Sequence, residues 1–139
     1  VVELLRDAEQ RPLEPATQLD IDGLVATSRA GGLNVAYTAE GTPPEHLAPA
    51  TALTVQRIVQ ESLTNAMKHG TGRAELAVCW GADNVVVETT NPVAPGATTR
   101  PGHGVEGMRQ RAALSGGTVT ASATPAGTWT TTARIPLNS

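Results

Sequence analysis

The sequence predicts a two-layer α/β sandwich, in which about five strands form a mixed sheet and about three helices cover one of its faces. Two pairs of short segments, at 74–90 and 118–137, alternate apolar and polar residues as half-buried strands do. A stretch from about 50 to 69 has instead the spacing of a long helix with one apolar stripe. Both kinds of segment in one chain of 139 residues favour a single domain whose helices pack on the sheet.

The first half of the chain alternates linker, helix, strand, loop and helix. Residues 1–18 predict a short amphipathic start and a proline-broken linker, and we expect the folded domain to occupy 19–139. Residues 19–32 open with acidic side chains and end in Gly-Gly, which is the polarity of a helix with a glycine stop. Residues 33–38 predict a strand and 40–49 a loop, and the long helix then runs until Gly70 stops it.

The second half predicts two strand pairs separated by a loop and a helix. Residues 74–80 and 84–90 are rich in β-branched residues and are joined by Gly-Ala-Asp, which indicates a hairpin. Residues 91–102 contain three prolines, two glycines and little to bury, so we expect a loop there. Residues 105–117 predict a short helix that ends in Gly-Gly, before the second strand pair.

Composition and charge exclude several classes of function. The formal net charge of −3 gives no electrostatic reason to expect binding to nucleic acid or to an anionic membrane surface. No apolar run approaches the roughly 20 residues that span a bilayer. The single cysteine excludes an internal disulfide and fits a reducing, cytoplasmic setting. Because the chain begins with Val rather than Met, we expect it to be part of a longer protein, whose membrane anchor would lie elsewhere.

Four polar residues gather on one side of the long helix, apart from its apolar stripe. At about 100° per residue, Glu61, Asn65, Lys68 and His69 share a side, whereas the apolar stripe is centred on Val59. The rest of that apolar stripe comprises Val55, Ser62, Leu63, Ala66 and Met67. A solvated helix face would explain such a polar stripe, but a carboxylate and an amide oxygen also suit Mg²⁺, and Lys and His suit phosphate oxygens.

A glycine motif begins the helix predicted at 105–117. Gly102, Gly104 and Gly107 fit the spacing G-x-G-x-x-G. The dinucleotide-binding form of this motif requires a strand directly before it and an acidic residue about 20 positions later, and this sequence has neither. Two interpretations stay open: a structural loop cap, or an anion site built from backbone amides at a helix N-terminus.

These two motifs together carry a resemblance to a known family. The stretch RIVQESLTNAMKHG, a Pro/Gly-rich loop, and GHGVEGMRQRAALSGG followed by two strands resemble the ATP-binding catalytic domain of two-component sensor histidine kinases. The likeness covers nearly all of residues 19–137 and is greatest to the DesK-like branch, which pairs with response regulators of the NarL/LuxR type. It implies the Bergerat fold of the GHKL superfamily and the cofactors ATP and Mg²⁺.

The resemblance also implies roles for individual residues. Glu61 matches the acidic residue that acts on the phospho-acceptor or a metal-bound water, and Asn65 matches the Mg²⁺ ligand, so both are the expected metal-site residues. The other residues matched to the nucleotide site are Lys68 and His69 at the phosphates, Asn91 and Thr128 near the adenine, and the glycine-motif residues Gly102, His103, Gly104, Val105 and Gly107. Residues of about 92–104 match the ATP lid.

One departure from the family pattern concerns the adenine contact. The family has an aspartate where this sequence has Asn91, in ETTNPVAPG, and the glycines that follow are displaced. A carboxamide oxygen still accepts a hydrogen bond, but without charge, so we expect adenine to be bound more weakly by about 1 kcal/mol.

The parts that the chain lacks determine its expected partners. None of His46, His69 and His103 has the sequence context of the phospho-acceptor histidine, so we expect transfer to a separate dimerisation domain of the same parent protein and then to a response regulator. Residues 1–18 would be the tail of those dimerisation helices or their linker. Two alternatives stay open: an anti-sigma-factor serine kinase of the same superfamily, and a binding module that has lost nucleotide chemistry.

Overall fold

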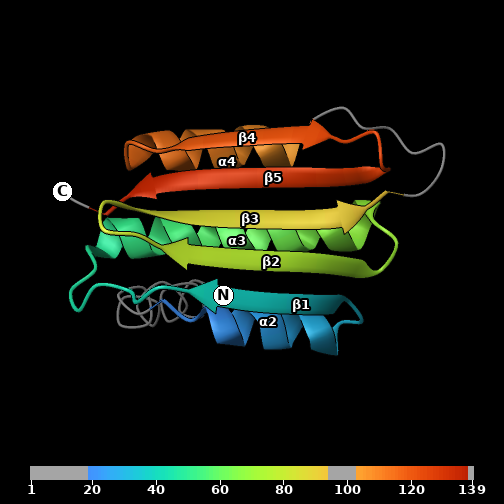
Figure 1. The fold of residues 1–139 in the computed structure, drawn as a ribbon, viewed down its shortest axis with the longest axis horizontal. Helices are drawn as coiled ribbons and strands as arrows, with labels where there is room; N and C mark the ends of the chain where they lie inside the picture. The colour runs from blue at the N-terminus through green and yellow to red at the C-terminus, as the bar shows by residue number, and fades with distance from the viewer. Residues whose placement is uncertain (1–18, 94–102, 138–139) are drawn as a thin grey trace, which may run out of the picture.

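The computed structural model describes residues 19–93 and 103–137 and places them in two layers (Figure 1). Within this part of the chain a five-stranded sheet, in the order β1-β2-β3-β5-β4, carries three helices on one face. Strands β1 and β2 pair in parallel and all other neighbours are antiparallel. This confirms the predicted two-layer α/β sandwich. The elements are α2 (Ile21–Ala30), β1 (Asn34–Glu40), α3 (Pro49–His69), β2 (Arg73–Trp80), β3 (Asn84–Pro92), α4 (His103–Leu114), β4 (Thr118–Ala123) and β5 (Thr128–Pro136).

Local sequence explains where the helices begin and end. The Asp20 carboxylate accepts a hydrogen bond from the Gly23 amide at 2.9 Å and so caps the start of α2. Pro49 opens α3 in the first helical position, where its missing N–H costs nothing. At the other end, the Gly70 amide donates to the Ala66 carbonyl at 2.9 Å and closes the last turn. The glycine stop predicted for the long helix is therefore confirmed.

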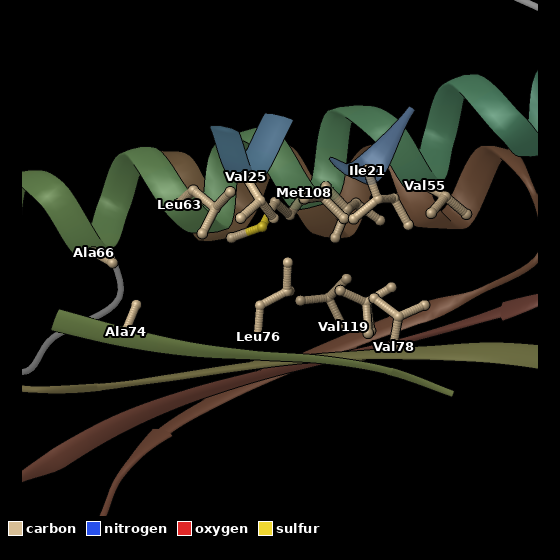
Figure 2. Packing of buried hydrophobic residues seen from close by; sticks show 14 of the residues in the cluster. Ile21, Val25, Val55, Leu63, Ala66, Ala74, Leu76, Val78, Met108 and Val119 are labelled. Atoms are coloured by element: carbon tan, nitrogen blue, oxygen red, sulfur yellow. The ribbon is translucent and has the colours of Figure 1, made fainter. Parts of the chain in front are cut away.

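The core lies between the helices and the sheet and is almost entirely aliphatic (Figure 2). On β3 and β5, alternate residues are buried, so every second side chain faces the helices. Figure 2 shows Met108 of α4 and Leu63 of α3 facing Leu76 of β2 across this layer. Burying each such side chain contributes about 1.5–3 kcal/mol, which lets a domain without phenylalanine fold.

Two boundaries of the sequence prediction are corrected. Met67, expected in the apolar stripe of the long helix, is 40% exposed, whereas Ile58 is fully buried because α4 covers a further side of α3. The loop predicted at 91–102 begins later, since Asn91 and Pro92 continue β3 and pair with β5. Pro92 is tolerated because the ladder between β2 and β3 ends at Thr90. The missing N–H of Pro92 would point toward β2, where the ladder requires no hydrogen bond.

At each free edge of the sheet, an arginine from a neighbouring helix bonds to one outward-facing carbonyl. Arg29 of α2 donates from Nε and Nη2 to the carbonyl of Val35 on β1, at 3.2 and 2.8 Å. Arg109 of α4 donates from Nε to the carbonyl of Val119 on β4, at 3.2 Å. Both carbonyls point away from the sheet. The residues before and after them in each strand are the ones whose backbone groups bond to the adjacent strand. Occupying them reduces the capacity of each edge to pair with another chain.

Candidate functional site

Two pairs of side chains fix how α3 and α4 lie against each other. The hydroxyls of Thr54 and Ser115 are 2.8 Å apart, so the start of α3 meets the end of α4. Further along, the Ser62 hydroxyl donates to the Met108 sulfur at 3.5 Å. The helices therefore run antiparallel, and each later turn of α3 faces an earlier turn of α4. Continuing this register brings Asn65 level with the first turn of α4, where the glycine motif lies.

The polar stripe of α3 divides into a half-buried part and an exposed part. Glu61 and Asn65 are of intermediate burial, and Lys68 and His69 are exposed in the last turn. Arg111 of α4 brings its Nη1 to 3.9 Å from Glu61 Oε1, with 37% and 36% of the two side chains exposed. A pair at that distance and exposure contributes at most about 1 kcal/mol, so Glu61 stays available to another partner. The four residues thus occupy one side of α3, as the sequence predicted.

Asn91 lies at the end of β3, against the last turn of α3. Its side chain is 4% exposed, and its Nδ2 donates to the Pro92 carbonyl at 3.0 Å, which leaves Oδ1 as an acceptor. Gly70 forms an isolated antiparallel bridge with Val93, and a Cβ on Gly70 would come within 2.9 Å of Asn91 Nδ2. The structure therefore brings Asn91 close to the end of the polar stripe, although some 20 residues separate them along the chain.

Trp129, and not Thr128, lies opposite Asn91. The register of β3 and β5 pairs Asn91 with Trp129 and Pro92 with Thr128, so Thr128 faces the open side of the sheet. The Thr128 hydroxyl is 2.6 Å from that of Thr124, across the turn between β4 and β5. The structure thus does not group the Thr128 side chain with Asn91. The sequence pattern alone did not single out Trp129.

A second residue that sequence reasoning missed is Thr89. It shares the helix-facing side of β3 with Asn91, two residues away, and is 3% exposed. Its hydroxyl has no hydrogen-bond partner among the residues that the structure describes. The only sequence signal for it is the period of two that places it on the same face as Asn91.

The glycine motif is described only in part. Gly102 and most of the predicted ATP lid lie outside the described residues, as does the predicted linker 1–18. The backbone of α4 begins at His103 and includes Gly104 in its first turn. Val105 is 3% exposed and belongs to the core, so its own contribution to a ligand would come from its backbone amide. Gly107 lies in the same helix, where a Cβ would meet only Arg111 Nη1, at 3.5 Å.

The donors on α3 suit a shared metal ion better than a metal site built from protein alone. Within 19–93 and 103–137, no three His, Cys, Asp or Glu side chains are grouped so that they could hold a metal ion. Glu61 and Asn65 supply one carboxylate and one carboxamide. Mg²⁺ commonly takes one or two such protein ligands and completes its octahedron with water and substrate phosphates. The pair therefore fits Mg²⁺ bound together with a polyphosphate.

None of the helices in the described part of the chain is both long and apolar enough to cross a membrane.

Comparison with known proteins points to sensor histidine kinases. The chain is 33% identical over 81 residues to the signal transduction histidine-protein kinase/phosphatase UhpB of Salmonella typhimurium. It is 32% identical over 93 residues to the sensor histidine kinase YxjM of Bacillus subtilis. These matches cover 56% and 66% of this chain but only 16% and 23% of the two relatives, so the chain spans less than a quarter of their length. No family model matches the chain.

Three solved structures of similar fold are histidine kinases or their domains. The histidine kinase domain of the blue-light activated kinase EL346 from Erythrobacter litoralis has a TM-score of 0.60 at 16% identity, over 84% of this chain and 57% of that one. The histidine kinase AdeS of Acinetobacter baumannii has a TM-score of 0.62 at 14% identity, over 87% and 66%. The catalytic domain of histidine kinase ThkA has 0.62 at 12%, over 84% and 90%.

Together these findings define the fold of the domain. The fold is the α/β sandwich of the histidine kinase catalytic domain, and the curated relatives that share part of its sequence are sensor histidine kinases.

Proposed function

We propose that this chain is the ATP-binding catalytic domain of a sensor histidine kinase of the DesK-like branch. The observation that carries the proposal is the antiparallel register of α3 and α4. It sets the stripe of Glu61 and Asn65 beside the N-terminus of α4, at the end of the sheet where Asn91 is buried. A helix N-terminus favours anions, and the stripe supplies both cation ligands and cationic groups.

In this proposal the residues divide between the two ends of a nucleotide. Asn65, with Glu61, holds Mg²⁺, which when bound neutralises charge on the phosphates. Lys68, His69 and the backbone of the glycine motif bind the phosphate oxygens. The Oδ1 atom of Asn91 accepts a hydrogen bond from the adenine amino group. Glu61 orients and deprotonates the phospho-acceptor histidine, whose nitrogen bonds to the γ-phosphorus as the bond to the bridging oxygen breaks and ADP leaves.

The partners follow from the same proposal. The phospho-acceptor histidine lies on the dimerisation domain of the parent protein, a homodimer in which this domain would be cytoplasmic. The phosphoryl group then passes to a response regulator of the NarL/LuxR type. Partial similarity to sensor histidine kinases supports this arrangement.

Nucleotide binding is the first test of this function. Trp129 lies opposite Asn91, and Trp80, the other tryptophan, lies at the far end of β2, so a Trp80→Phe variant isolates Trp129 as a fluorescence reporter. We expect ADP with Mg²⁺ to change this fluorescence and to raise the midpoint of thermal unfolding. At about 100 times Kd the ligand adds roughly 2.7 kcal/mol to the free energy of unfolding. No response at millimolar ADP would contradict the proposal.

Two variants separate binding from catalysis. Asn65→Ala removes a metal ligand, so we expect at least about tenfold weaker Mg²⁺-dependent binding. Glu61→Gln keeps the size of the side chain and one oxygen ligand but removes its basicity. Phosphorylation of an added dimerisation domain should therefore fall by about 100-fold or more, well beyond any loss of Mg²⁺-dependent ADP binding. If the parent domain binds ADP but never phosphorylates such a domain, the alternative of a binding module without catalysis is correct.

A further inference from the structure

Thr89 is the one buried polar side chain whose hydroxyl lacks a partner in the described part of the chain. Its side chain is only 3% exposed, so water does not freely replace the missing bond. Leaving a buried hydroxyl unpaired is unfavourable, and such a group in a folded domain calls for an explanation.

Strand geometry explains why Thr131, directly across the sheet, does not satisfy Thr89. The Val93 amide donates to the Gly127 carbonyl, so the pairs that follow at every second residue, including Thr89 with Thr131, exchange backbone hydrogen bonds. In such pairs the Cα atoms are about 5.5 Å apart, against about 4.5 Å in the alternate pairs.

Thr90 and Thr130, on the other face of the same two strands, provide a contrast. They form one of the alternate, closer pairs, and their hydroxyls are 3.3 Å apart. Identical side chains one residue apart therefore differ: one is bonded on the open face, and the other is unpaired on the helix-facing side.

The unpaired hydroxyl lies beside the candidate site. Thr89 and Asn91 are alternate residues of β3 on one face, so their Cα atoms are about 7 Å apart. In the described part of the chain, the Asn91 amide nitrogen is already hydrogen-bonded to the Pro92 carbonyl, its Oδ1 remains an acceptor, and the Thr89 hydroxyl has no partner. One accepts a hydrogen bond, and the other can donate or accept. Two neutral groups of this kind suit the polar edge of a purine better than a phosphate.

We infer that Thr89 is a second residue that recognises the base, and that it gains its missing hydrogen bond only when an adenine nucleotide binds. This inference rests on the proposed function and extends it. The hydroxyl bonds to the polar edge of the base, directly or through one water that enters with the nucleotide. It thereby supplements the uncharged Asn91. Without ligand, the unpaired hydroxyl lowers the free energy of unfolding of the domain.

The variant Thr89→Val tests the inference because stability and affinity should change in opposite directions. Valine has nearly the shape of threonine but no hydroxyl, so the ligand-free domain should melt about 2–4 °C higher. The same variant should bind ADP about tenfold more weakly. A hydroxyl with a merely structural role would give the reverse sign for stability and no consistent loss of affinity.

Two further variants serve as controls. Thr89→Ser keeps the hydroxyl and should bind ADP within about threefold of the parent domain. Thr90→Val removes the bonded hydroxyl on the open face, so it should lower the melting temperature slightly and leave ADP affinity unchanged.

The outcomes separate this inference from the function on which it rests. If the parent domain shows no response to ADP, the proposed function fails and the inference falls with it. If the parent binds ADP and Thr89→Val binds it equally well, or if Thr90→Val loses affinity to the same extent, only the role of Thr89 is overturned. A lower melting temperature for Thr89→Val would show that its hydroxyl already has a structural partner.

Discussion

Replacing Asn91 by aspartate tests the buried end of the site, because it exchanges one donor for an acceptor in a side chain that is 4% exposed. The Asn91 amide donates to the Pro92 carbonyl at 3.0 Å, and an ionised carboxylate cannot make that bond. The lost hydrogen bond costs about 1 kcal/mol, and the carboxylate that now faces a carbonyl in a buried site adds about 2 kcal/mol. We expect Asn91→Asp to lower the free energy of unfolding by about 3 kcal/mol at pH 7.

The penalty should depend on pH in a direction that can be worked out. Burial beside a carbonyl disfavours the charged form, so the pKa of the introduced carboxyl should rise from about 4 in the unfolded chain to about 6 in the folded domain. Below pH 4 the protonated carboxyl donates to Pro92 in place of the amide, and the variant should be nearly as stable as the parent. Stability should then fall by about 1.4 kcal/mol per pH unit between pH 4 and pH 6 and stay low above that range.

Urea unfolding of parent and variant at a series of pH values measures this profile. Asn34→Asp, on an exposed position of β1, is the matched control and should show no such pH dependence. ADP affinity is an independent test. Asn91→Asp should bind ADP about fivefold more tightly than the parent, because a charged acceptor makes a stronger hydrogen bond with the adenine amino group than a neutral one. If Asn91→Asp has the stability of the parent at pH 7, the buried amide bond to Pro92 is not as described and the reasoning is refuted.

Three other features give predictions that do not depend on nucleotide. Gly70→Ala would place its Cβ 2.7 Å from a backbone carbonyl of α3 and 2.9 Å from the buried amide nitrogen, so the free energy of unfolding in urea should drop by about 1–3 kcal/mol; an unchanged value would contradict the close packing there. Arg109→Ala exposes the outward carbonyl of Val119, so the free energy of unfolding should fall by about 1 kcal/mol. The variant should also associate with increasing concentration in sedimentation velocity, and a variant that stays monomeric would refute the edge-protecting role. Burial, and after it the negative charge of Asp22, raises the pKa of Tyr37, the only tyrosine, so the free energy of unfolding should decline as pH rises above about 10. Asp22→Asn should lower the pKa of Tyr37 in a phenolate absorbance titration, and an unchanged pKa would exclude the charge effect.

The sequence was sufficient to predict the fold because its local patterns agree with the global arrangement. Buried and more exposed residues alternate along β2 and β3, and glycines end the predicted helices near the observed positions. The error at Asn91 and Pro92 has a physical cause. Asn-Pro is typical of a turn, but nine residues of β3 pair with β5 and extend the strand through it, and the proline lies where no ladder bond is required.

The candidate site was only partly predictable. Features that depend on neighbouring turns of one helix could be predicted, whereas features that depend on the pairing of distant strands could not. The grouping of Glu61 with Asn65 depends on the pitch of one helix, so sequence alone fixes it. That Trp129 lies opposite Asn91, and that Thr89 is left unpaired, depends on the register between strands nearly 40 residues apart. No local pattern specifies that register in advance, because a shift of one residue would exchange the two faces of β5 and put Thr128 or Thr130 in the same place.

The distribution of charge along the candidate site matches the polarity of a nucleotide. The most buried polar groups, Thr89 and Asn91, are neutral, whereas Lys68 and His69 are exposed in the last turn of α3 and Glu61 is half-buried. Charged groups are costly to bury without partners, and neutral ones need only a hydrogen bond, so a ligand that is neutral at one end and polyanionic at the other fits this gradient in one orientation. Under the proposed function, that orientation would place the base against the sheet and the phosphates toward solvent. Compared with the aspartate of the histidine kinase pattern, Asn91 carries no charge, so under the proposed function the base would be recognised by groups whose strength does not depend on salt.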